Sequence, residues 1–472
     1  MLNPPGVKYE LADKARGIVY GGVGLMVKLA REVGLVAAMD RRLHLLQMHL
    51  PDHESDHVLN VALNALCDAT CLQDMELRRN DEVFLDALGA EAIPDPTTAG
   101  DFCRRFDLDD LDDLRDAIDD ARLHVWARQA SEFFEEAVID IDSTLVVTTG
   151  ECKEGMDISY KGTWGYHPLL VTLANTGEVL NLVNRSGNRP SEEGAAAEAD
   201  RAIALGRRAG FRQVRLRGDT AFSQTQHLDH WDGWGVRFQF GYDARPNLVN
   251  RAENLAASAW KRLKRPPAYT RQGPPRTRPR NVKRQVIRQR AFLHQELHSE
   301  PVAEFDDRPG ACRQAYRMIV VRKNLSIAQG EQCLFDDLRY FFYISNDRSR
   351  SAENILAEAH ERCGEQENLI EQLKNGIHAL RVPLYDLVSN WAYMVIASLA
   401  WTLKAWFALT LPPSAREELL HMEFKRFLYA LIRIPCQIVR AARRITVRLL
   451  AYTRYVHLLF RSLDATARLG FS

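Results

Sequence analysis

The chain has 472 residues, 46% of them hydrophobic and 26% charged, which is enough for two to four domains with sizeable cores. Its 62 basic and 62 acidic residues cancel, which excludes a uniformly basic or acidic protein. The charges are nevertheless segregated along the chain, which favours contact with a polyelectrolyte. The eight cysteines include no C-x-x-C pair, and no apolar leader begins the chain, so we expect reduced thiols in the cytoplasm.

Residues 1–130 are predicted to form a helical region. Apolar residues recur there at spacings of three and four, as in "HVLNVALNALCDATCL". Residues 101–120 contain nine aspartates beside a single apolar face, a pattern typical of a packed helix with an acidic, solvated side.

The apolar period changes to two at Glu136, and residues 131–245 are predicted to form a mixed α/β sheet. Three strands are expected in "AVIDIDSTLVV", "HPLLVTLANT" and "EVLNLVNRSG", followed by a helix, the strand "QVRLRGD", a second helix and the strand "VRFQFGY". Three successive strands followed by strands reached through helices give the order β-β-β-α-β-α-β.

Residues 246–334 interrupt this pattern and are predicted to form a β-rich basic insertion. Residues 261–290 contain twelve Lys or Arg and no acid, beginning with Lys261, Arg262, Lys264 and Arg265 directly after Trp260. A run of this kind is usually a solvated loop. Its density and its aromatic flanks favour contact with nucleic acid.

The remaining segments, 335–411 and 412–472, are predicted to be a second part of the core and a basic helical C-terminal region. The last fifty residues hold ten Lys or Arg and two acids. The segment Trp391–Leu411 is long enough to span a bilayer. It contains Lys404 and scattered tryptophans, so we expect a helix buried in the core and no membrane contact.

Three acidic positions carry the chemical interpretation. Asp140 and Asp142 lie two apart in one strand and therefore share a face, where a buried carboxylate must be paired or bind a metal. Asp219 follows a strand and a glycine, at the strand end where α/β sheets place ligands. Glu367 lies on a helix and shares a stripe with four other residues: His360, Cys363, Glu371 and Lys374.

Each position has an ordinary reading by itself: an ion pair, a turn or a solvated helix face. Together they predict a phosphoryl-transfer site with two Mg²⁺ (or Mn²⁺) ions, which prefer oxygen ligands. Period two alone leaves open whether Asp140 or Asp142 is the first ligand.

The motifs "DIDST", "RGDTAFS" and "QENLIEQLKNG" resemble, in this order, those of bacterial insertion-sequence transposases of the DDE class, in the cut-and-paste branch. The resemblance runs from about residue 130 to 411. It implies an α/β fold, namely a ribonuclease-H-like mixed sheet with an inserted β-rich basic subdomain, flanked by helical N- and C-terminal regions. The "DST" context selects Asp142, and the spacing of 148 residues between Asp219 and Glu367 fits the insertion.

The resemblance implies catalytic and metal-binding roles for Asp142, Asp219 and Glu367, and a DNA phosphate contact for Lys374. Related transposases have Tyr and Arg seven and four residues before the Glu, where this chain has His360 and Cys363. The nearest Arg is Arg362, which lies off the stripe and is a candidate DNA contact. Trp260 is a candidate for stacking on a flipped base. Asp140 and Glu371 are supporting or alternative acids.

The expected partners are double-stranded DNA with terminal inverted repeats, target DNA and a second copy of the chain when two ends are paired. The N-terminal region would recognise the ends, and the protein would be cytoplasmic and nucleoid-associated. Two alternatives remain open. One is a ribonuclease-H-like nuclease or resolvase without strand transfer, and the other is a domesticated relative that binds DNA without cutting it.

Overall fold

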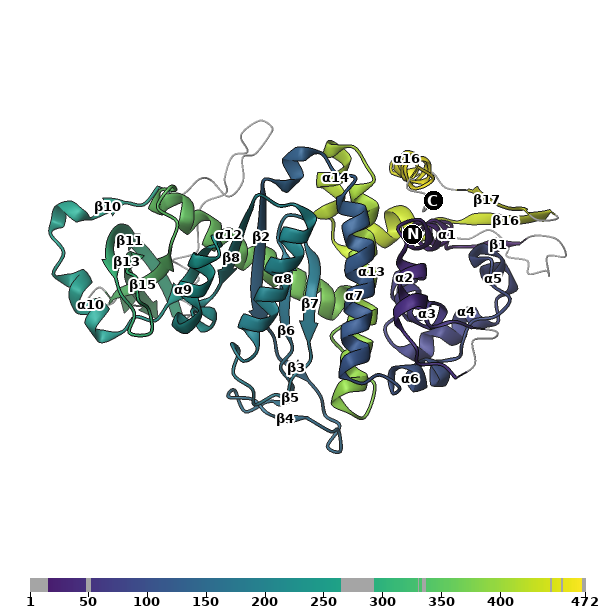
Figure 1. The fold of residues 1–472 in the computed structure, drawn as a ribbon, viewed down its shortest axis with the longest axis horizontal. Coiled ribbons are helices and arrows are strands. Elements are labelled where there is room, and N and C mark those ends of the chain that lie inside the picture. Colours follow the sequence, from purple (N-terminus) through teal and green to yellow (C-terminus); the bar gives the residue numbers. More distant parts are fainter. Residues whose placement is uncertain are drawn as a thin grey trace.

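The computed structural model describes residues 16–47, 52–264, 293–329, 331–332, 337–441, 444–450 and 453–468. A long twisted sheet runs through the molecule, and a helical region stands beside it (Figure 1). Between them lie the long helices α7 and α13, which belong to opposite ends of the chain.

The N-terminal region is helical, as predicted, apart from the short strand β1 (Gly17–Ile18). Its helices pack through a continuous set of buried apolar residues. They are α1 (Val23–Glu32), α2 (Leu35–Arg42), α3 (Glu54–Leu66), η1 (Leu72–Met75), α4 (Glu76–Arg79), α5 (Glu82–Leu88), α6 (Pro96–Cys103), α7 (Leu108–Trp126) and η2 (Ser131–Phe134).

The predicted order β-β-β-α-β-α-β is confirmed in the centre of the chain. The elements are β2 (Glu136–Ser143), β6 (Leu169–Leu173), β7 (Glu178–Val183), α8 (Ala195–Ala209), β8 (Gln213–Gly218), η3 (Thr220–Phe222), α9 (Thr225–Gly233) and β9 (Arg237–Tyr242). Strand β2 pairs antiparallel with β6 and parallel with β8, and β8 pairs parallel with β9. The sheet is therefore mixed, with β2 next to the parallel strand that leads to Asp219.

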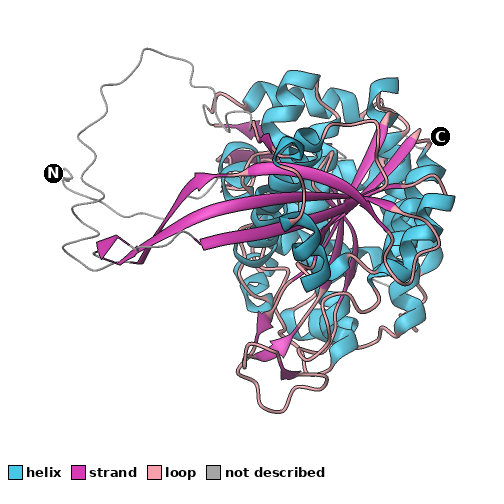
Figure 2. Ribbon diagram, turned by 90° about the vertical axis from the view of Figure 1, so that its left-hand side faces the viewer, coloured by secondary structure: helices cyan, strands magenta, loops and turns pink. Residues whose placement is uncertain are grey.

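The described strands of the insertion do not form a sheet of their own. Strand β13 pairs with β15 (Asp337–Ser345), which belongs to the predicted second part of the core, and β15 pairs with β9. The path β10-β12-β13-β15-β9-β8-β2-β6-β7 is therefore continuous, and β11 and β14 join it on β13. Figure 2 shows the long strands of this sheet crossing the molecule. The predicted boundaries at 246 and 334 therefore separate segments of one sheet. The elements of the insertion are α10 (Pro246–Glu253), η4 (Ala257–Ala259), β10 (Lys261–Arg262), β11 (Leu293–Ser299), β12 (Pro301–Asp307), β13 (Tyr316–Gln329) and β14 (Glu331–Gln332). Most of the basic run lies outside the described residues.

A second, small sheet between β2 and β6 was not predicted. Its order is β3-β5-β4, formed by β3 (Val146–Val147), β4 (Asp157–Ile158) and β5 (Trp164–Tyr166). Two- and three-residue strands give too little periodicity to be found in the sequence. This sheet begins directly after the "DST" motif and therefore lies beside the C-terminal end of β2.

Helices cover both faces of the central sheet. On one face α8 packs on β2, β6, β7 and β8, and its Gly206 lies against Ala137 and Val214. On the other face α12 (Ala352–Glu371) crosses β2, β8 and β9 and continues into the π-helical turn η5 (Gln372–Gly376). The α12 face is the one that carries the acidic side chains of β2.

Helix α13 (Leu387–Leu409) is long and apolar enough to cross a membrane, but it lies buried within the protein, as the core-helix interpretation predicted. The fully buried Glu178 of β7 fastens it to the sheet. The Glu178 carboxylate accepts hydrogen bonds from the indoles of Trp406 (2.8 Å) and Trp126 (2.9 Å) and from Arg122 Nε (3.1 Å). This one carboxylate joins α7, α13 and the sheet.

The C-terminal region is not wholly helical, which corrects the prediction for 412–472. Strand β16 pairs with both β1 and β17. Cys436 and Ile438 alternate with more exposed residues and face inward, a strand pattern that the many arginines had obscured. The elements are α14 (Pro413–Leu420), α15 (Phe424–Phe427), η6 (Leu428–Ile432), β16 (Cys436–Ala441), β17 (Arg444–Leu449) and α16 (Val456–Thr466).

Candidate active site

Charged side chains form a ladder on the face of β2 and β8 beneath α12. Asp140 and Asp142 project to this face, as period two predicted, and Ile139 and Ile141 are buried on the other. In the parallel register Asp140 stands opposite Arg217, and Ile141 opposite Gly218. Each rung of the ladder therefore joins one residue of β2 to one of β8.

The rung formed by Asp140 and Arg217 is an ion pair buried inside the protein. Arg217 Nε lies 2.6 Å from Asp140 Oδ1, and Nη2 lies 2.7 Å from Oδ2, so the contact is bidentate. Both side chains are buried, and the remaining Nη1 donates to the Glu358 carbonyl at 3.3 Å. The charge of Asp140 is thus compensated, and both of its oxygens accept from the buried guanidinium.

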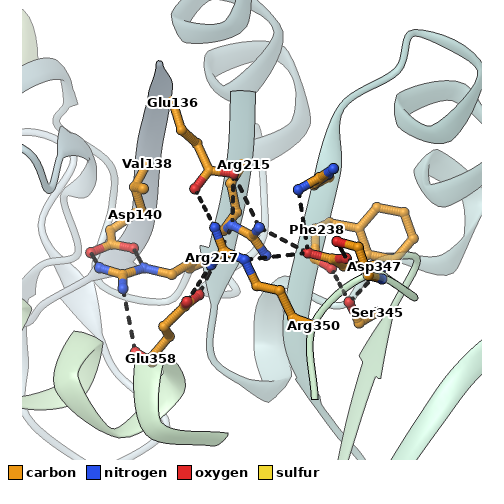
Figure 3. A network of polar contacts seen from close by, with 12 residues as sticks. Glu136, Val138, Asp140, Arg215, Arg217, Phe238, Ser345, Asp347, Arg350 and Glu358 are labelled. Carbon is orange, nitrogen blue, oxygen red and sulfur yellow. Dashed lines mark hydrogen bonds and ion pairs between the residues drawn. The ribbon is translucent and has the colours of Figure 1, made fainter. Parts of the chain in front are cut away.

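The rungs nearer the start of β2, called the lower rungs, are also charge-compensated (Figure 3). Arg215 is fully buried and lies 3.0 Å from Glu136 and 2.9 Å from Asp347. Arg350 Nη2 reaches the other oxygen of Glu136 at 2.8 Å. These contacts join β2, β8 and the segment after β15 in one network.

The top rung pairs two acids. Asp142 and Asp219 occupy the positions that follow Ile141 and Gly218 in the register, at the ends of adjacent parallel strands about 4.8 Å apart. Burial, with a smaller contribution from the Asp219 carboxylate, raises the pKa of Asp142 to about 6 against the opposing charge of Arg362. Asp219 is exposed and caps η3 by accepting a hydrogen bond from the Ala221 amide at 2.9 Å.

The negative charge of Asp142 in the top rung is only weakly compensated. Asp142 Oδ1 accepts from the Ser143 amide at 2.8 Å, and Oδ2 lies 3.5 Å from Arg362 Nη1. The side chain is only 19% exposed, so water screens its charge incompletely. Two neighbouring carboxylates with a single arginine contact, at 3.5 Å, carry excess negative charge that suits a hard divalent cation.

Glu367 does not join this pair in the structure. Helix α12 turns Arg362, Gln366 and Leu369 toward the sheet, and Glu367 and Glu371 are exposed. Within the described ranges no three His, Cys, Asp or Glu side chains lie together as a metal-binding group. The three-acid site therefore stays a prediction for Glu367.

A cavity of about 340 Å³ opens beside the top rung. Asp219, Arg362 and Cys363 line it together with aromatic residues of β9 and β15. Glu367 lies one helical turn after Cys363 and hence on the same side of α12. This places Glu367 beside the cavity, although its carboxylate has no contact with Asp142 or Asp219.

Lys374 lies in the π-helical turn at the end of α12 and reaches the strand motif. Its Nζ donates to Thr144 Oγ1 at 2.6 Å and to the Leu145 carbonyl at 2.9 Å. Burial lowers its pKa, and among the described residues no carboxylate lies within ion-pair distance of it. The lysine is thus hydrogen-bonded to a residue two positions after Asp142. Single π-helical turns of this kind are frequent at functional sites.

The basic residues predicted at the start of the insertion lie far from these acids. Strands β12, β13, β15 and β9 separate β10 from β8, a distance of about 24 Å. Lys261, Arg262 and Lys264 are exposed there, and Arg322 covers the Trp260 ring at 4.4 Å. Arg265 lies outside the described residues. These residues are therefore not part of the site around Asp142.

The residues that hold the acids and the lysine in place were not predicted. Arg217, the partner of Asp140, could have been found, because "RLRGD" places two arginines at period two on the strand that precedes Asp219. The hydrogen bond from Lys374 to Thr144 had no local signal, since 230 residues separate the two. Arg362 was expected to lie off the functional stripe, but it is buried toward Asp142.

The match to a protein-family model agrees with the motifs. The family model described as "Transposase DDE domain group 1" matches residues 19–470. A solved structure of piggyBac transposase in a synaptic complex with hairpin DNA is 10% identical with a TM-score of 0.36, covering 87% of this chain and 84% of that one. A search of curated proteins found no match. Because the family model spans nearly the whole chain, the protein belongs to the DDE transposase family.

Proposed function

We propose that the protein is the transposase of a bacterial insertion sequence, which cuts DNA at the ends of its element and joins them to a target. The observation that carries this proposal is the top rung, where Asp142 and Asp219 meet without a compensating arginine on either strand. The strand order β7-β6-β2-β8-β9, antiparallel and then parallel, supports a ribonuclease-H-like core.

Asp142 and Asp219 would hold divalent cations, with Glu367 as the third ligand. Two Mg²⁺ or Mn²⁺ ions at this place would neutralise the attacking and leaving oxygens of an in-line displacement at phosphorus. Arg362 holds Asp142 in position, because its guanidinium contacts both the Ile141 carbonyl and the Asp142 carboxylate. Arg217 keeps Asp140 out of the metal site by occupying both of its oxygens.

Duplex DNA with terminal inverted repeats is the proposed substrate, and target DNA is the second. The N-terminal helical region would recognise the ends, and the exposed basic residues of β10 would hold backbone phosphates away from the cut. A homodimer would pair the two ends. In the cell the protein would then be cytoplasmic and associated with the nucleoid.

The test uses the full chain and a labelled duplex that carries the DNA flanking this reading frame. With Mg²⁺ we expect cleavage at the element end, followed by joining of the 3′ end to a plasmid target. Asp142→Asn and Asp219→Asn should abolish both products and spare DNA binding. Cleavage without joining would show a nuclease or resolvase, and binding without either product would show a non-catalytic relative.

A further inference from the structure

A groove on the side of β2 away from the 340 Å³ cavity has a strongly one-sided charge. Its volume is about 520 Å³. It is lined by Lys374, by Arg381, by residues of β3 and by the Thr70–Cys71 turn of the N-terminal region. Two cations and no carboxylate line it, so the groove suits an anion.

Both cations have donors to spare. The Lys374 ammonium has three N–H donors, of which Thr144 and the Leu145 carbonyl take two. Arg381 is exposed, and no hydrogen bond or ion pair joins its guanidinium to another described residue. Glu371 is the acid that acts on Lys374 through its charge, from outside the groove lining.

The position of the groove indicates what kind of anion it holds. Thr144 follows Asp142 in the chain by two residues, so an anion at Lys374 lies next to the proposed site of phosphoryl transfer. Residues 145–147, which follow Thr144, also line the groove and lead away from Asp142. A phosphate chain fits this layout, because successive phosphates of one strand can contact Lys374 and then Arg381.

We propose that this groove holds the backbone of the DNA strand next to the cut, with Arg381 as a phosphate-binding residue and the Thr70–Cys71 turn as the opposite wall. The inference rests on the proposed function and extends it. It gives the N-terminal region a second task, since that region would close on the strand that the core cuts.

The first experiment compares Arg381→Gln with Arg128→Gln in the full chain. Arg128 is likewise exposed, has no side-chain ion pair among the described residues and lies at the end of α7, outside the groove. We expect Arg381→Gln to reduce the slope of log affinity against log salt by about 0.9 on the end-bearing duplex, because one phosphate contact is lost. Arg128→Gln should leave the slope unchanged. Equal slopes in the wild type and both variants would overturn the proposal.

The second experiment locates the DNA with a native thiol. Cys71 lines the groove, and Cys152 is exposed outside it. A duplex with a disulfide-activated tether on the phosphate beside the cut should crosslink to the wild type and to Cys152→Ser, and the crosslink should disappear in Cys71→Ser. A crosslink that survives Cys71→Ser would overturn the proposal. Protection of Cys71 from alkylation by inorganic phosphate but not by DNA would also overturn it, because the groove would then be a small-anion site.

These outcomes are separate from those that test the proposed function. Cleavage that requires Asp142 and Asp219 but is unaffected by Arg381→Gln, with no crosslink at Cys71, would refute the groove and leave the transposase. A crosslink at Cys71 in a protein that never cuts DNA would refute the enzyme and leave the groove.

Discussion

The lower and upper rungs of the ladder between β2 and β8 use the same residue types for opposite purposes. Below, Asp140 has both oxygens taken by Arg217, and Arg215 is surrounded by Glu136 and Asp347. Above, Asp142 and Asp219 face each other, and the nearest arginine stands at 3.5 Å. One strand thus carries an ion-paired carboxylate and, two residues on, the carboxylate that we propose as a metal ligand.

This difference indicates that the partner on the next strand sets what an acid can do. In a buried ion pair the two charges compensate each other, and removal of one partner leaves the other charge buried alone. A pair of acids leaves negative charge unbalanced, and a bound cation can balance it. The predictions below test this division, beginning with the largest expected effect.

Replacement of the upper acids should remove catalysis and leave the fold intact. We expect Asp142→Asn and Asp219→Asn to lower the rate of DNA cleavage by about 1000-fold or more, since metal ligands contribute several kcal/mol to phosphoryl transfer. Cleavage rates in Mg²⁺, with circular dichroism as the folding control, measure this. A variant that cuts at a tenth of the wild-type rate would contradict the assignment.

Loss of the lower arginine should instead remove stability. Arg217→Met leaves Asp140 buried without a partner, and we expect a loss of about 3–5 kcal/mol in the free energy of unfolding. The matched control is Arg212→Met, which breaks an exposed pair with Glu135 and should cost about 0–1 kcal/mol. Urea unfolding of the two variants gives the comparison, and similar losses in both would remove the structural role from the lower rung.

The third acid can be identified by comparing glutamates on α12. We expect Glu367→Gln to lower cleavage by about 100-fold, because it removes a proposed metal ligand. Glu371→Gln should have a small effect, since Glu371 lies one turn beyond Glu367 and accepts a hydrogen bond from Asn375 Nδ2 at 2.8 Å. The result would reverse if the helix rotates on DNA binding so that Glu371 becomes the ligand.

The raised pKa of Asp142 predicts a pH dependence of stability. The folded state holds this proton more tightly than the unfolded chain, so stability falls as pH rises from about 4 to about 6. Above pH 6 the metal-free Asp142→Asn variant should be more stable than the wild type by on the order of 2 kcal/mol. Unfolding curves across this range measure the difference, and identical pH profiles would show that Asp142 is not destabilised by its neighbours.

The smallest expected effect concerns the C-terminal hairpin. Arg444 and Arg448 are exposed on one face of β17, and no ion pair within the described ranges engages them. If this face contacts DNA, the double change to Gln should reduce the salt slope of binding by about 1.8 and leave cleavage at saturating DNA unchanged. An unchanged slope would restrict the DNA contacts to the core and the N-terminal region.

Several features of this site could be predicted from the sequence. Period two placed Asp140 and Asp142 on one face, and the order of elements around Asp219 was correct. These depend on local patterns, which a sequence displays directly. The core position of α13 followed similarly from Lys404 and the scattered tryptophans.

Long-range pairing explains what could not be predicted. The motif "RLRGD" indicates arginines on the strand before Asp219, but the pairing of Arg217 with Asp140 depends on the register of β2 against β8. The pairing of β13 with β15 and of β16 with β1 also depends on partners distant in the chain. Glu367 remains undecided for the same reason, because its position depends on how α12 sits on the sheet.

Direct metal binding tests the central claim, that the upper rung binds the catalytic cation and the lower rung does not. Calorimetric titration of the full chain with Mn²⁺, without DNA, separates this from every later step. We expect the wild type and Arg212→Met to bind Mn²⁺. The affinity for Mn²⁺ should be at least tenfold weaker in Asp142→Asn and Asp219→Asn. Undiminished Mn²⁺ affinity in those two variants would contradict it.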